Sequence, residues 1–118
     1  FELLEQAVPA AERIFGAKSY DSATLLVNLG AMAGMLGKHE QARAYLERAA
    51  ALLVELVGPA HPEVALVYSN LGSAAAALAD YKAARGYMMQ ALDAYTTALG
   101  DEHPEVARLY NNIGSIYS

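Results

Sequence analysis

Residues 58–65, with the sequence GPAHPEVA, return 42 positions later as GDEHPEVA at residues 100–107. At the same offset, YSNLGS at residues 68–73 returns as YNNIGS at residues 110–115. The register runs back to the start of the chain without a gap, so that Gly16 falls on Gly58. A period of this size is typical of proteins built by stacking short structural units. The sequence therefore predicts a repeat array.

Each 42-residue unit is predicted to hold two helices. In the middle unit, Gly58 is expected to end one helix, because glycine takes a left-handed conformation at little cost. Pro62 suits the first position of the next helix, where a missing N–H costs nothing, and Glu63 suits the positive helix end. Apolar residues then recur at the spacing of a buried helical face. The predicted buried stripes are Leu26, Leu29, Ala33 and Leu36; Ala42, Tyr45, Leu46 and Ala49; Tyr68, Leu71, Ala75 and Leu78; and Ala84, Tyr87, Met88, Ala91 and Tyr95.

These stripes predict an all-α solenoid of antiparallel helix pairs. Residues 1–17 are expected to form the second helix of a preceding repeat, residues 18–60 and 61–102 two complete repeats, and residues 103–118 the first helix of a following repeat. Half-pairs at both ends suggest a fragment of a longer protein.

Glycine recurs inside the first helix of each predicted repeat, at Gly30, Gly72 and Gly114. Inside a helix it costs about 1 kcal/mol relative to alanine. Its return at one column therefore predicts that neighbouring helices approach closely there.

The composition narrows the class of partner. The chain has 118 residues, a formal net charge of −5 and 8 scattered Lys and Arg residues. Nucleic acid is therefore not an expected partner, because binding its backbone needs clustered basic side chains. No apolar stretch approaches the roughly 20 residues that span a bilayer, so no membrane association is expected. The chain has no cysteine, which excludes disulfides and suits a reducing, cytoplasmic setting.

The repeat columns resemble those of the tetratricopeptide repeat (TPR), in particular the 42-residue form found in kinesin light chains and many bacterial signalling proteins. The resemblance covers the whole chain. It rests on Asn-Leu-Gly at residues 28–30 and 70–72, on the paired alanine columns of the second helices and on the Gly-x-x-His-Pro-Glu-Val-Ala linker. HEAT and armadillo arrays have a similar period but do not predict these columns. The resemblance implies a right-handed superhelix whose first helices line a concave, peptide-binding face.

Residue by residue, the resemblance implies groove contacts from the Asn before Leu-Gly, its preceding neighbour and the adjacent helical turns. The groove candidates are Thr24, Asn28, Leu66, Ser69, Asn70, Ser73, Arg108, Asn111, Asn112 and Ser115. Asn amides can both donate to and accept from a peptide backbone. The same amides can also bond to a neighbouring repeat, so both roles stay open. Arg108 is the only basic residue in the set. Family members that hold acidic peptides have several, so recognition of an acidic ligand is not expected.

Other candidate residues have structural interpretations. His61 and His103 lie one repeat apart, too far to share a zinc ion with bonds of about 2 Å, so helix capping is preferred to a metal site. No catalytic triad, phosphate loop or carboxylate pair is found, so neither enzymatic activity nor a cofactor is expected. The Met88-Met89 pair and the recurring tyrosines are assigned to the core. These tyrosines are Tyr45, Tyr68, Tyr87, Tyr95, Tyr110 and Tyr117.

The leading hypothesis is a protein–protein interaction scaffold that binds a peptide or partner segment in the concave groove. One alternative is self-association as a homo-oligomer through the end helices, whose apolar stripes lack a neighbouring repeat. Those stripes are Leu3, Leu4 and Ala7 at one end and Tyr110, Ile113 and Tyr117 at the other. A second alternative is a regulatory or sensor arm of a larger signalling enzyme.

Overall fold

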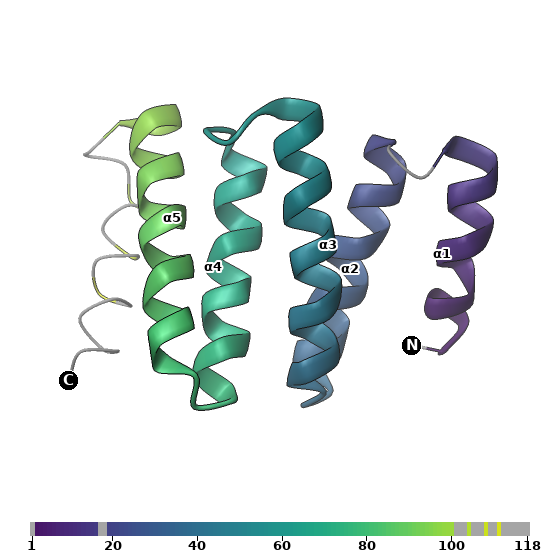
Figure 1. Cartoon of the computed structure of the whole chain (residues 1–118), viewed down its shortest axis with the longest axis horizontal. Coiled ribbons are helices and arrows are strands. Elements are labelled where there is room, and N and C mark those ends of the chain that lie inside the picture. The colour runs from purple at the N-terminus through teal and green to yellow at the C-terminus, as the bar shows by residue number, and fades with distance from the viewer. Residues whose placement is uncertain (1, 17–18, 101–103, 105–107, 109–110, 112–118) are drawn as a thin grey trace.

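The computed structural model describes residues 2–16, 19–100, 104, 108 and 111. This part of the chain forms five helices and no strand: α1 (Glu2–Phe15), α2 (Tyr20–Met35), α3 (His39–Val57), α4 (Pro62–Ala77) and α5 (Tyr81–Leu99). The helices stand side by side in chain order, from α1 at one end to α5 at the other (Figure 1). The predicted all-α architecture of stacked helices is confirmed. The pair α2–α3 lies within residues 18–60, and the pair α4–α5 within residues 61–102.

Three glycines, each one repeat apart, end the helices α1, α3 and α5. Gly16, Gly58 and Gly100 have φ angles of 91°, 88° and 90°, a region that favours glycine. In each case the glycine N–H donates to the carbonyl four residues earlier at 3.0 Å. The terminating role predicted for Gly58 is therefore confirmed, and it recurs at both neighbouring repeats.

The helix α4 begins at Pro62, as the sequence predicts. The Nδ1 atom of His61 accepts a hydrogen bond from the Glu63 N–H at 3.1 Å and caps the helix. Capping is thus confirmed for His61, whereas His103 lies outside the described residues. No cluster of three or more acidic and histidine side chains suited to a metal ion occurs within the described ranges.

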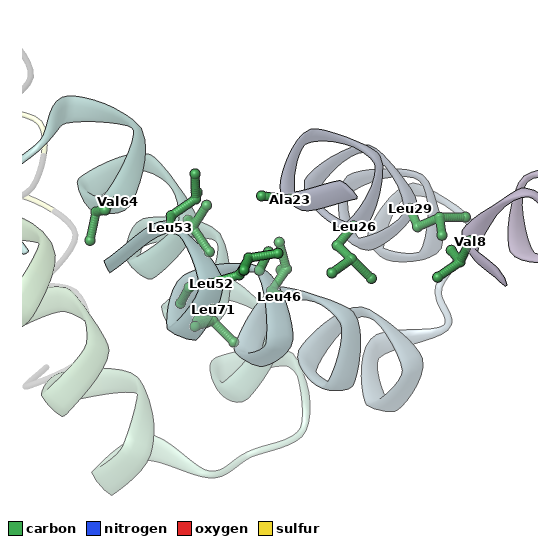
Figure 2. Close-up of a cluster of buried hydrophobic side chains, with 12 residues drawn as sticks. Val8, Ala23, Leu26, Leu29, Leu46, Leu52, Leu53, Val64 and Leu71 are labelled. Carbon is green, nitrogen blue, oxygen red and sulfur yellow. The ribbon is translucent and has the colours of Figure 1, made fainter. Parts of the chain in front are cut away.

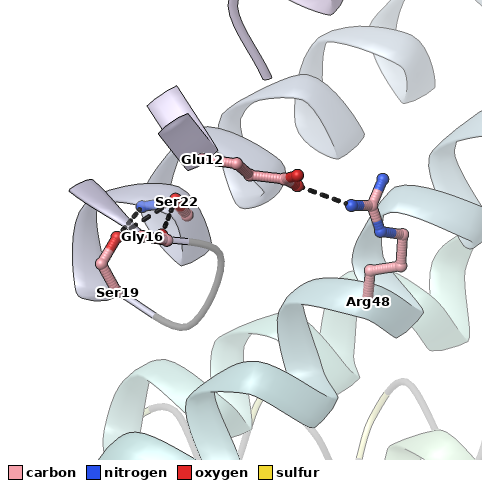
Figure 3. Close-up of polar contacts among 5 residues, drawn as sticks. All are labelled: Glu12, Gly16, Ser19, Ser22 and Arg48. Carbon is pink, nitrogen blue, oxygen red and sulfur yellow. Dashed lines mark hydrogen bonds and ion pairs between the residues drawn. The ribbon is translucent and has the colours of Figure 1, made fainter. Parts of the chain in front are cut away.

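Serine hydrogen bonds hold the junction between α1 and α2, and an ion pair nearby links α1 to α3 (Figure 3). The Ser19 Oγ accepts from the Ser22 N–H at 3.2 Å, which caps α2, and the Ser22 hydroxyl donates to the Gly16 carbonyl at 2.9 Å. One turn before the end of α1, Glu12 pairs with Arg48 of α3 at 2.9 Å. The ion pair therefore links α1 directly to α3.

An apolar core runs through the stack from α1 to α4 (Figure 2). Leu29, Leu46, Leu53 and Leu71 are fully buried at its centre. Burying one leucine side chain contributes roughly 1.5–3 kcal/mol. A second cluster, which includes Met88, joins α4 to α5. Because each helix is buried mainly by its neighbours in the stack, stability is distributed along the array.

Two residues that the sequence assigns to the core, Leu36 of a predicted stripe and Met89 of the methionine pair, lie on the surface instead. Leu36 is 57% exposed, because α2 ends at Met35 and the 3.6-residue period no longer applies beyond it. Met88 is buried as predicted, but Met89 is 51% exposed. Adjacent residues of a helix point about 100° apart, so both cannot face the same neighbour.

The recurring tyrosines pack against the core but are not all enclosed. Tyr95 is buried, and Tyr45, Tyr68 and Tyr87 are half-buried against apolar clusters. The rings of Tyr68 and Tyr87 stack with their centroids 6.4 Å apart. Core packing is therefore confirmed for these four, while Tyr110 and Tyr117 lie outside the described residues.

Two tyrosine–glutamate hydrogen bonds recur one repeat apart and join successive second helices. Tyr45 of α3 donates to Glu5 of α1, and Tyr87 of α5 donates to Glu47 of α3 at 2.9 Å. The hydrogen bond to Glu5 raises the pKa of Tyr45 above 10.0. Burial, and then the hydrogen bond to Glu47, raises the pKa of Tyr87 above the same value.

The glycine column is confirmed as a point of close approach. A Cβ atom added at Gly30 would lie 2.5 Å from the Cγ of Leu46, and one added at Gly72 would lie 2.6 Å from the terminal methyl of Met88. Leu46 and Met88 are themselves one repeat apart on the second helices. Each first helix can therefore lie against its second helix only because it has no side chain at this point.

We predict that Gly30→Ala lowers the free energy of unfolding by about 1–3 kcal/mol, because the new methyl overlaps a branched, fully buried leucine. Gly72→Ala should cost less, since methionine can withdraw the end of its flexible side chain. Urea unfolding followed by circular dichroism measures both. Gly86→Ala in α5 is the matched control, because a Cβ there meets nothing within 4 Å. It should raise stability by up to about 1 kcal/mol, and equal losses at Gly30 and Gly86 would contradict the close approach.

A second prediction concerns the turn between α4 and α5. Ala79 has φ of 60°, whereas the equivalent residue one repeat earlier is Gly37, with φ of 78°. Ala79→Gly removes a strain of about 1–2 kcal/mol and loses about 0.5–1 kcal/mol to the added freedom of the unfolded chain. Thermal unfolding should therefore show a net gain of about 0.5–1 kcal/mol. Ala44→Gly, inside α3, should instead lose about 1 kcal/mol, and a loss at both positions would refute the strain at Ala79.

The tyrosine–glutamate pairs predict a stability that falls in alkali. A folded-state pKa raised above the unfolded value means that the folded chain holds the phenolic proton more tightly. The stabilisation is fully present below pH 10 and is lost as the pH rises through the folded pKa of Tyr45 and Tyr87. Urea unfolding at a series of pH values from neutral to strongly alkaline measures this slope. Tyr87→Phe should make the alkaline fall in stability less steep. Tyr81→Phe, at an exposed tyrosine, is the control and should leave the slope unchanged.

Candidate binding groove

The first helices α2 and α4 lie on either side of α3, which packs against both. Two hollows open between them. The residues from α2 and α4 lie toward the C-terminal ends of these helices in the larger hollow and toward their N-terminal ends in the smaller one, and α3 contributes to both. The two hollows therefore follow each other along the space between α2 and α4, with α3 beneath both. They are together called the α2–α4 trough.

The larger hollow has a volume of about 370 Å³ and a mostly apolar lining. Met35, at the edge, is 82% exposed. A Cβ atom added at Gly34 would meet nothing within 4 Å, so the space beside this glycine is open. Asn70 and Ser73 of α4 supply hydrogen-bonding groups on the opposite wall. The hollow can therefore accept an apolar side chain and bond to the backbone that carries it.

The smaller hollow, of about 180 Å³, is more polar at its rim. Thr24 and Asn28 of α2 face Glu63 and Leu66 of α4 across it. The Thr24 hydroxyl donates to the Tyr20 carbonyl at 3.0 Å, which leaves its oxygen as an acceptor. The Tyr20 hydroxyl donates to the Glu63 carboxylate and so connects α2 with α4 at this end of the trough. That hydrogen bond raises the pKa of Tyr20 above 10.0.

Five groove candidates from the sequence line the trough: Thr24, Asn28, Leu66, Asn70 and Ser73. The family resemblance predicted groove contacts from the first helices, and these five residues of α2 and α4 line the two hollows of the trough. Whether they contact a ligand remains a prediction.

The remaining candidates lie elsewhere. The sequence analysis expected the side chain of Ser69 to face the groove. In the structure this residue is buried, with only 4% of its surface exposed. It precedes Asn70 by one residue and therefore points about 100° away around the helix. Arg108 and Asn111 are exposed, while Asn112 and Ser115 lie outside the described residues.

The sequence analysis missed Met35, Gly34, His39 and Glu63 as lining residues. A signal for Met35 was present, because it follows Thr24, Asn28 and Ala31 at three- and four-residue spacing. Glu63 likewise starts the stripe that continues through Leu66 and Asn70. His39 comes from α3, and only the packing of the three helices brings it to the hollow.

Self-association through the end helices stays a prediction. Ala7 is half-buried, and the side chains of Leu3 and Leu4 and the residues Tyr110, Ile113 and Tyr117 lie outside the described part of the chain. None of the helices in the described ranges has the length and hydropathy needed to cross a membrane.

Stacked antiparallel helix pairs with a 42-residue period and a glycine at each close approach define a helical-repeat solenoid. The family model of the tetratricopeptide repeat matches residues 1–54, 21–97 and 63–118, three overlapping stretches that together span the chain. The chain belongs to the tetratricopeptide repeat family. Repeats of this family mediate protein–protein interactions.

Several solved structures are similar to this chain over almost its whole length. The protein BtubC (BKLC) from P. vanneervenii is 25% identical, with a TM-score of 0.84 over 98% of this chain and 46% of its own. A putative kinesin light chain from Podosopora anserina, with nearly identical TPR-like repeats, is 21% identical, with a TM-score of 0.86 over 98% of this chain and 55% of its own. A point-substituted variant of the latter gives the same values. The chain thus spans about half the length of these structures. No protein with a curated description matches it.

Proposed function

We propose that the chain is a non-enzymatic scaffold that binds a peptide or partner segment in the α2–α4 trough. The observation that carries this proposal is the larger hollow, about 370 Å³ in volume, open to solvent beside Gly34 and Met35. Apolar hollows with a few convergent polar groups are the usual form of binding sites. A cytoplasmic location is proposed with it, in keeping with the absence of cysteine.

The polar groups around the trough support an extended ligand. Asn28 and Asn70 each offer an amide that can donate to and accept from a peptide backbone. Such bonds tolerate many side chains, much as the edge of a sheet does, and leave selectivity to the hollows between them. Asn28 is exposed and Asn70 is half-buried, so the amide of Asn28 is the more accessible of the two.

A test is to block the larger hollow without disturbing the core. Gly34→Leu places a side chain in open space and should improve the helix propensity of α2. Peptides selected from a random dodecamer phage library on the unmodified chain should bind this variant at least about tenfold more weakly, since an occupied hollow can no longer bury an apolar side chain. Fluorescence anisotropy with the selected peptides measures the affinities.

Gly86→Leu in α5 is the matched control, because it adds the same side chain at another open helical glycine, away from the trough. It should leave the affinities unchanged. Asn70→Ala tests the amide separately and should weaken binding by roughly two- to tenfold, the range of one hydrogen bond. Selected peptides that bind the Gly34→Leu variant as tightly as the unmodified chain would show that the trough is not the binding site.

A further inference from the structure

The charges of the α2–α4 trough are unevenly placed. The sequence of α2 has one charged residue, Asp21, and that of α4 has one, Glu63. Both are carboxylates in the first turn of their helix. Asp21 is exposed and starts the stripe that continues through Thr24 and Asn28, while Glu63 lines the smaller hollow. One end of the trough is therefore acidic.

The opposite end has a different character. The larger hollow there is mostly apolar, and Lys38 and His39 follow the C-terminal end of α2. Neither α2 nor α4 contains a basic residue that could neutralise the two carboxylates at the first end. A ligand in the trough thus meets negative charge at one end and an apolar hollow near the other.

The Tyr20 hydroxyl positions Glu63. It donates to the Glu63 carboxylate across the trough, so this carboxylate is oriented without being neutralised. A carboxylate can accept several hydrogen bonds, and a cationic side chain can share it with a phenol. Glu63 is partly buried, so solvent and salt screen its charge less than they would screen a fully exposed carboxylate.

We propose that the α2–α4 trough binds a cationic segment of a partner protein, in extended form, with an apolar side chain in the larger hollow and a Lys or Arg beside Asp21 and Glu63. This rests on the proposed function and specifies the partner's chemistry. The larger hollow lies about 15–20 Å along α2 from its first turn, at about 1.5 Å per residue. An extended chain covers that distance in about five residues, at about 3.3 Å each.

A defined peptide panel tests this inference. Each dodecamer carries one Arg and one Leu separated by one to nine Ser or Gly residues, and matched peptides replace the Arg by Glu or the Leu by Ser. Binding to the full chain is measured by fluorescence anisotropy at low and physiological salt. The Arg–Leu peptides should bind best at a separation of about five residues. The Glu peptides should be weaker by roughly two- to fivefold per lost ion pair, and this difference should shrink at the higher salt.

Variants of the chain locate the charge effect. Asp21→Asn with Glu63→Gln should abolish the preference for Arg over Glu, and glutamine can still accept the Tyr20 hydrogen bond. The control, Glu55→Gln with Asp93→Asn, makes the same change in net charge at exposed positions outside both hollows and should keep the preference.

The outcomes separate this inference from the proposed function. Peptides that lose binding in the Gly34→Leu variant but bind equally with Arg or Glu would overturn the cationic preference and leave the trough as the site. A preference for Arg that is equally sensitive to both double variants would show only a general charge effect and would also overturn the inference. If no peptide in the panel or the random library depends on Gly34, both proposals fail.

Discussion

The contact between a glycine of the first helix and a bulky apolar side chain of the second helix sets the geometry of the pairs α2–α3 and α4–α5. Leu46 and Met88 occupy the space that a side chain at Gly30 or Gly72 would need. Because the helices meet so closely there, Ala42 and Ala84 can be fully buried between them. Gly30 and Leu46 also line the larger hollow, so the same contact that fixes the helix pair shapes the floor of the trough.

Much of this architecture could be read from the 42-residue period, because glycine, proline and alanine recur where the backbone leaves few alternatives. Gly58, Pro62 and Gly72 have the roles that their chemistry predicts. The site was less predictable. Periodicity alone does not show where a helix ends, as Leu36 demonstrates, nor which of two adjacent side chains turns inward, as Met89 and Ser69 demonstrate. The contribution of His39 depends on three helices packing together.

The trough combines features that act over different ranges. In the proposed complex, the apolar hollow and the asparagine amides would act at contact distance, whereas the carboxylates of Asp21 and Glu63 would attract or repel a partner before contact. Charges at the rim of an interface influence the rate of association and the choice of partner more than the final affinity. In the proposed binding mode, the acidic end of the trough would select the partner by charge, and the apolar hollow would anchor it by shape.

The tyrosine–glutamate pairs have a mechanical consequence. They tie α1 to α3 and α3 to α5, the second helices of the stack, at equivalent points one repeat apart. A solenoid bends when the spacing of its helices changes more on one side than on the other. Because the second helices are linked, their spacing is expected to change less than the spacing of the first helices. Bending of the array would then open or close the space between α2 and α4, while the spacing of α1, α3 and α5 stays nearly constant.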